Sequence, residues 1–162
     1  MVATDMFIVG SRLGIGDSTP TDHTLVCRLY EKAATLDEPC PGGHPDAMLH
    51  LALHYERGLG MPQSHDKAYQ YYNMITKHPH PGEEVLSDAL KALSRFHAEG
   101  LGGAEQSEEL SLKYLAFAQS NPESAEELEH IERWYESGGR DQIMKTTSEV
   151  LNRMSAAEED TR

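Results

Sequence analysis

The stretch DAMLHLALHYERGLGMPQSHDKAYQYYNMITKHP, residues Asp46–Pro79, predicts a helix, a glycine turn and a second helix. Its first part, Asp46–Arg57, is apolar on nearly all sides, which is typical of a helix covered by several neighbours. Gly58–Gly60 follows it, and glycine supplies the positive φ that the end of a helix commonly needs. Ser64 or Asp66 is suited to begin the second helix, which should reach about residue 77. The stretch therefore predicts a helical hairpin.

Features of this hairpin recur along the chain. The first glycine of each turn recurs at intervals of 44, 42 and 38 residues, at Gly14, Gly58, Gly100 and Gly138. Seven residues before these glycines stand Phe7, Leu51, Leu93 and Ile131. Intervals of this size indicate stacked helical pairs. No single pair could bury its apolar face alone, so neighbouring pairs must pack together.

The rest of the sequence predicts further helices and no alternating strand, so we expect an all-α fold. The expected helices are an abbreviated one within residues 1–16, then 23–36 with Asp22 as its cap, 84–99, 107–119, 124–137 and about 141–156. We expect one repeat domain over residues 1–157, with repeats at 3–36, 46–78 and 84–119, a degenerate copy at 124–156, and a polar tail at 158–162.

These motifs resemble the Sel1-like repeat family, a relative of the tetratricopeptide repeats. The resemblance is carried by LALHYERGLG (Leu51–Gly60), DKAYQYY (Asp66–Tyr72) and LYEKAA (Leu29–Ala34). It implies a right-handed α-α superhelix, or solenoid, of about three helix pairs with a C-terminal capping helix. The positions that carry the repeat are Leu51, Tyr55, Gly58, Gly60, Ala68, Tyr72, Leu93, Gly100, Gly102 and Tyr114.

The resemblance also implies that the first helix of each pair lines a concave groove. Helical geometry then selects the outward positions, which include Glu56 and the expected partner-binding residues Leu49, Leu53, Arg57, Lys91, Arg95, Glu99 and Arg133. An apolar floor beside arginines suits a peptide with an apolar anchor and acidic groups. The alternative is that Leu49 and Leu53 belong to the core and the basic residues pair with Glu99, Glu129 and Glu136.

Charge restricts the class of partner. The 162 residues include 27 Asp and Glu against 14 Lys and Arg, a net charge of −13. Such a chain would be repelled by nucleic acid and by anionic membranes, so we expect a protein partner. The N-terminus does not have the pattern of a signal peptide. The two cysteines, Cys27 and Cys40, are too few for a disulfide framework, and we expect reduced thiols and a cytoplasmic protein.

Catalytic and metal-binding chemistry is weakly indicated. His50 and His54 have the i, i+4 spacing of metal ligands, but the glutamate of a zinc-protease motif is missing, so we expect a structural or surface pair and no cofactor. Cys27 should be buried rather than nucleophilic. We therefore expect a non-enzymatic adaptor or scaffold. The alternatives are an acidic inhibitor or immunity-type protein that blocks a basic toxin or enzyme, and a hydrolase-like enzyme.

Overall fold

The computed structural model describes residues 3–14, 20–35, 42–120, 122, 124–139, 141 and 145. Within these residues the chain is helical and contains no strand, which confirms the all-α prediction. The chain divides into two compact units, Met1–Leu128 and Glu129–Arg162. The predicted domain bounds, 1–157, stay a prediction.

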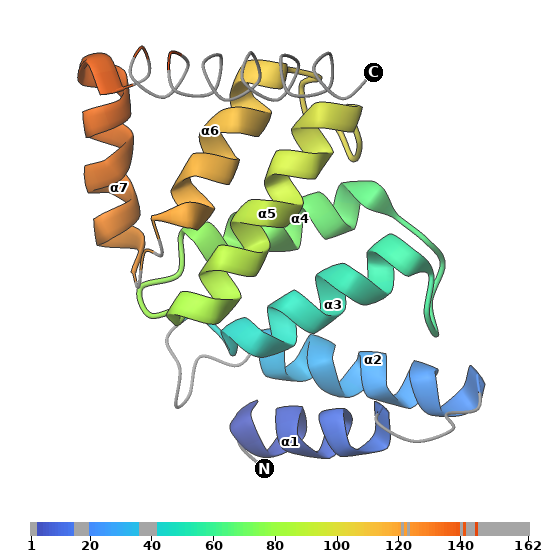
Figure 1. Cartoon of the computed structure of the whole chain (residues 1–162). Helices are drawn as coiled ribbons and strands as arrows, with labels where there is room; N and C mark the ends of the chain where they lie inside the picture. Colours follow the sequence, from blue (N-terminus) through green and yellow to red (C-terminus); the bar gives the residue numbers. More distant parts are fainter. Residues whose placement is uncertain are drawn as a thin grey trace, which may run out of the picture. The chain divides into compact units, whose positions relative to one another are not determined.

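Among the described residues, six helices lie wholly within the first unit, and they pack in consecutive pairs (Figure 1). They are α1 (Ala3–Gly14), α2 (Pro20–Thr35), α3 (Pro45–Arg57), α4 (His65–Thr76), α5 (Glu83–Glu99) and α6 (Glu108–Gln119). The pairs are α1 with α2, α3 with α4, and α5 with α6; α2 also packs on α3, and α4 on α5. A smaller contact joins α3 to α5, the first helices of adjacent pairs. This neighbour-to-neighbour packing is the arrangement of an α-solenoid.

The core runs through all three pairs rather than lying in one of them. Fully buried side chains include Val26, Leu51, Tyr72, Leu93 and Phe96. Each lies on the apolar stripe of its helix. In a single isolated pair, part of these stripes would be exposed to water. Burying a side chain of this size contributes about 1.5–3 kcal/mol.

In the turns that follow α3 and α5, the first and second glycines have different roles. Gly58 and Gly100 end α3 and α5 in the left-handed conformation, with φ of 69° and 68°. Gly60 and Gly102 have positive φ as well, but they also lie against the preceding pair. A Cβ atom on Gly60 would lie 2.4 Å from the backbone of His23, and one on Gly102 would lie 2.3 Å from the carbonyl oxygen of His65. The second glycine therefore sets how closely adjacent pairs approach.

Serine caps begin the second helices of the later pairs. The Ser64 hydroxyl accepts a hydrogen bond from the Lys67 N–H at the start of α4, and Ser107 does the same for Leu110 at the start of α6. The prediction that Asp22 caps α2 is wrong, because that helix already begins at Pro20. Proline suits the first turn of a helix, where its missing N–H has no helical acceptor.

α7 (Ala125–Trp134) is shorter than the helix expected over residues 124–137. It continues into a π-helical turn over Tyr135–Gly139, in which Gly138 has a non-helical φ of 126°. The last expected helix, about 141–156, lies almost wholly outside the described residues.

Candidate interaction groove

One open pocket lies between the first helices of the second and third pairs. Its volume is about 270 Å³, and its lining residues are Leu49 and Leu53 of α3, Tyr72 of α4, and Asp88, Lys91, Ala92 and Arg95 of α5. Four of the seven predicted partner-binding residues, Leu49, Leu53, Lys91 and Arg95, are thus brought together around one pocket. Both leucines are partly exposed, so they are not enclosed core residues.

The other three predicted residues lie elsewhere. Arg57 and Glu99 are the exposed last residues of α3 and α5 and do not line this pocket. Arg133 is an exposed residue of the second unit, and its Nε donates to the backbone oxygen of Glu129 at 3.4 Å. For all seven residues, a role in partner binding stays a prediction.

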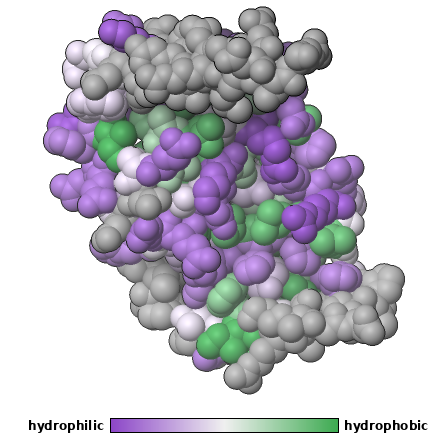
Figure 2. Space-filling view, viewed as in Figure 1, coloured by the Kyte–Doolittle hydropathy of each residue, from purple (hydrophilic) through white to green (hydrophobic). Residues whose placement is uncertain are grey.

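A second recess adjoins this pocket along α5. It has a volume of about 390 Å³, is lined by Glu83, Glu84, Ser87, Asp88 and Lys91, and shares the last two residues with the first pocket. Figure 2 shows the face on which α3 and α5 lie at the front, where small apolar areas are surrounded by hydrophilic side chains. We call the two recesses together the α5 groove.

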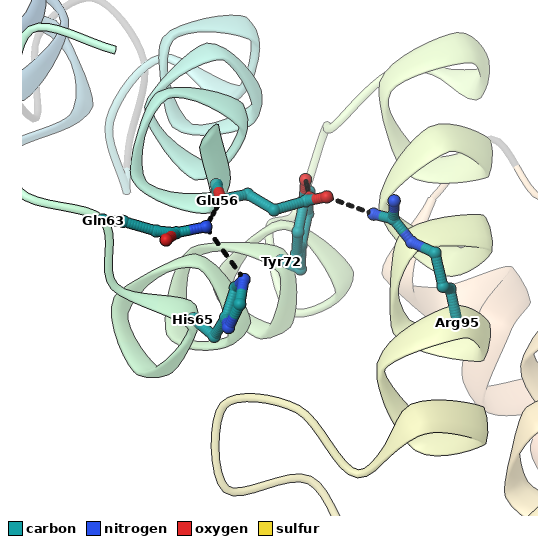
Figure 3. A network of polar contacts seen from close by, with 5 residues as sticks. All are labelled: Glu56, Gln63, His65, Tyr72 and Arg95. Carbon is teal, nitrogen blue, oxygen red and sulfur yellow. Dashed lines mark hydrogen bonds and ion pairs between the residues drawn. The ribbon is translucent and has the colours of Figure 1, made fainter. Parts of the chain in front are cut away.

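A largely buried carboxylate links the helices around the groove (Figure 3). Glu56 on α3 accepts a hydrogen bond from the Tyr72 hydroxyl at 2.8 Å and pairs with Arg95 Nη2 at 2.8 Å. The Glu56 side chain is only 14% exposed, whereas that of Arg95 is 48% exposed. Burial, together with the neighbouring carboxylate of Glu56, raises the pKa of Tyr72, so its hydroxyl remains a donor.

This network corrects two expectations. Glu56 was expected to face outward, but it points between α4 and α5. The alternative interpretation pairs the basic residues with Glu99, Glu129 and Glu136, yet the partner of Arg95 is Glu56, from the preceding pair of helices. The reason is that α3 and α5 are in direct contact. This contact places Glu56 within reach of Arg95, although the two residues are far apart in the sequence.

Lys91 pairs within its own helix. Its Nζ lies 3.1 Å from Asp88 Oδ1, at i, i+3 spacing, and both side chains are more than half exposed. Lys91 and Arg95 therefore each have a carboxylate beside them. The outward positions selected from the sequence did not include Asp88 and Glu84, which line the groove. Both lie on the same stripe of α5 as Lys91 and Arg95, and this spacing is the signal that could have identified them.

Three histidines, His44, His50 and His54, lie in the packing between α1, α2 and α3. His50 stacks on Tyr30 with ring centroids 5.2 Å apart, and His44 stacks on Phe7 at 4.6 Å. His54 donates from Nδ1 to the Leu59 carbonyl oxygen at 2.9 Å. Burial lowers the pKa of all three histidines. Across the described residues, no group of three or more His, Cys, Asp or Glu side chains is arranged to hold a metal ion.

Cys27 is buried, with 3% of its surface exposed. Its thiol donates to the Leu59 carbonyl oxygen at 3.2 Å and lies 3.2 Å from His54 Nδ1. Burial raises the pKa of Cys27 to about 11, so the group is a thiol rather than a nucleophilic thiolate at neutral pH.

Stacked helix pairs joined by glycine turns make this a helical repeat protein. Three stretches, residues 6–38, 45–77 and 87–118, match the Sel1 repeat. Together they cover more than half of the 162 residues, and the chain belongs to the Sel1 repeat family. Sel1 repeats are generally modules for protein–protein interaction.

The fold is similar to that of a protective antigen, present in uropathogenic Escherichia coli strains, whose crystal structure displays an SLR fold. The TM-score is 0.60 at 18% identity, and the similarity covers 89% of this chain and 26% of that one. The chain thus spans about a quarter of the length of that protein, and the likeness concerns the fold alone. A search of curated proteins found no match. None of the described helices is both long enough and apolar enough to span a membrane.

Proposed function

We propose that this protein is a non-catalytic cytoplasmic adaptor that binds a segment of a protein partner in the α5 groove. The observation that supports this most directly is the partly exposed apolar floor formed by Leu49 and Leu53 beside Ala92. At about 270 Å³, the pocket is smaller than the roughly 300–1,000 Å³ of typical small-molecule sites. One or two apolar side chains of a partner would fill it, and truncating such anchors typically has the largest effects on binding.

A matched pair of variants tests this function. Leu53→Asp places a charge in the pocket floor, and Leu115→Asp makes the same change at a 40% exposed leucine on α6 that does not line the pocket. Wild type and both variants are immobilised and exposed to native lysate, and captured proteins are quantified by mass spectrometry. We expect Leu53→Asp to reduce capture of specific partners at least about tenfold, because binding of an apolar anchor would desolvate the new carboxylate. Leu115→Asp should capture them normally.

The control of folding is circular dichroism of all three proteins. If Leu53→Asp is folded and captures the same partners in the same amounts as wild type, the groove is not the binding site.

A second candidate function is supported by the net charge of −13: an inhibitor or immunity-type protein that covers a basic surface of a toxin or enzyme. Such a protein would yield one dominant basic partner rather than several. Its association rate would fall steeply between low and physiological salt, because steering by charge is screened. Stopped-flow association at several salt concentrations distinguishes the two functions.

A further inference from the structure

The charges around the α5 groove are unequally compensated. Arg95 pairs with Glu56 at 2.8 Å, and Lys91 pairs with Asp88 at 3.1 Å. Glu83 and Glu84 are exposed on the rim of the second recess, and neither forms an ion pair with another described residue. The uncompensated charge of the groove is therefore negative. The basic residues alone, in contrast, predict an acidic ligand.

The helix dipole does not cancel this negative charge. Glu83 and Glu84 are the first two residues of α5, where the dipole is equivalent to roughly half a positive charge. The two glutamates contribute two formal negative charges, so the end of the groove stays acidic. The carboxylate of Asp88 lies one turn further along the same helix and is shared with Lys91.

The acidic end and the apolar floor have a defined separation. Ala92 is eight residues beyond Glu84 on α5, which is about 12 Å along the helix axis. A protein segment that spans this distance can place an apolar side chain on Leu49 and Leu53 and a basic side chain beside Glu83 and Glu84.

We propose that the occupant of the α5 groove is a protein segment that combines an apolar anchor with a lysine or arginine about 12 Å away. The anchor fills the pocket formed by Leu49, Leu53 and Ala92, and the cation binds Glu83 and Glu84. This inference rests on the proposed function, because it specifies the chemistry of the ligand in the same groove. The expected charge of the ligand is thus positive, whereas the basic residues of the groove alone suggest an acidic peptide.

The competing explanation is that Glu83 and Glu84 only stabilise the start of α5. The chain offers a matched control, because α6 also begins with two glutamates, Glu108 and Glu109. Glu83→Lys/Glu84→Lys and Glu108→Lys/Glu109→Lys change the net charge equally and place the same lysines in the first turn of a helix. Neither Glu108 nor Glu109 lines the two recesses.

The probe is a library of random 12-residue peptides displayed on phage. It is selected separately on the 162-residue wild type, on the two lysine variants and on Leu53→Asp, after circular dichroism has shown that each is folded. We expect wild type to enrich peptides that contain an apolar residue together with lysine or arginine. The excess of basic residues should vanish on Glu83→Lys/Glu84→Lys and persist on Glu108→Lys/Glu109→Lys, and Leu53→Asp should enrich none of these peptides.

One enriched peptide, synthesised with a fluorophore, gives the magnitude by fluorescence polarisation. Because rim charge pairs are individually weak, we expect its Kd to rise about 5- to 30-fold for Glu83→Lys/Glu84→Lys and less than about twofold for Glu108→Lys/Glu109→Lys.

The possible failures are distinguishable. The inference would be overturned if the enriched peptides had no excess of basic residues. It would also be overturned if both lysine variants changed the preference for basic residues equally. In both cases the proposed function would still stand. Failure of wild type to enrich any peptide, or equal enrichment by Leu53→Asp, would overturn the proposed function and the inference together.

Discussion

Removing the carboxylate of Glu56 should destabilise the packing of the second pair of helices on the third. In Glu56→Ala, the Tyr72 hydroxyl loses a charged acceptor 2.8 Å away, in a side chain with no exposed surface. A hydrogen bond to a charged group contributes about 1.5–3 kcal/mol. Loss of the Arg95 pair adds only about 0.5–1 kcal/mol, because that guanidinium is half exposed. We expect the free energy of unfolding to fall by about 2–4 kcal/mol.

A double-mutant cycle with Tyr72→Phe separates these contributions. Tyr72→Phe alone removes the hydroxyl and should cost about 1–2 kcal/mol, since Glu56 keeps its contact with Arg95. The two single variants both break the hydrogen bond between Tyr72 and Glu56, so their costs count it twice. The double variant should therefore be about 1–2 kcal/mol more stable than the sum of the two single effects predicts.

Urea denaturation followed by circular dichroism measures all four proteins, with m-values compared to check that the transition itself is unchanged. Asp88→Ala is the control, because it removes an exposed ion pair on α5 and should cost less than about 0.5 kcal/mol. Additivity of Glu56→Ala and Tyr72→Phe within about 0.3 kcal/mol would refute the reasoning, as would an Asp88→Ala cost equal to that of Glu56→Ala.

Three further properties can be measured on the same protein. Gly102→Ala and Gly103→Ala both place alanine at positive φ, but only at Gly102 would the new Cβ meet backbone, at 2.3 Å, so by urea denaturation Gly102→Ala should cost at least about 2 kcal/mol more. In a Cys40→Ser variant at pH 8, only about one Cys27 thiol in a thousand would be ionised, so reaction with Ellman's reagent should require unfolding; rapid reaction of the folded protein would contradict this. Acid should also destabilise the protein. A lowered pKa in the folded state means that the unfolded chain binds the proton first, so stability is present above about pH 6.5 and is lost below it. Urea midpoints at pH 7.5, 6.5 and 5.5 should show a slope of up to about 1.4 kcal/mol per pH unit for each of three histidines, His44, His50 and His54; a flat profile would mean that these rings are not protected from protons.

The repeat architecture was readable from the sequence because its signals are local. A glycine at the end of α3 or α5 is needed for a left-handed residue, and the apolar stripe of each helix has the helical period within a single segment. These requirements recur at a nearly constant interval, so their agreement across copies identified stacked pairs. The positions of Leu49 and Leu53 beside Lys91 and Arg95 follow from the same interval, since equivalent residues of adjacent copies lie side by side.

The pairing of charges could not be read in the same way. Helical geometry alone predicts that Glu56 faces outward, yet its carboxylate contacts Tyr72 of α4 and Arg95 of α5. Side chains of glutamate and arginine are long, and the choice among several nearby partners depends on a few ångströms of packing between helices. By itself, the sequence determined the helix pairs and their turns, and it named four residues that line the groove, Leu49, Leu53, Lys91 and Arg95. Only the tertiary structure decided which groove charges are already compensated, because that depends on distances between segments that are far apart along the chain.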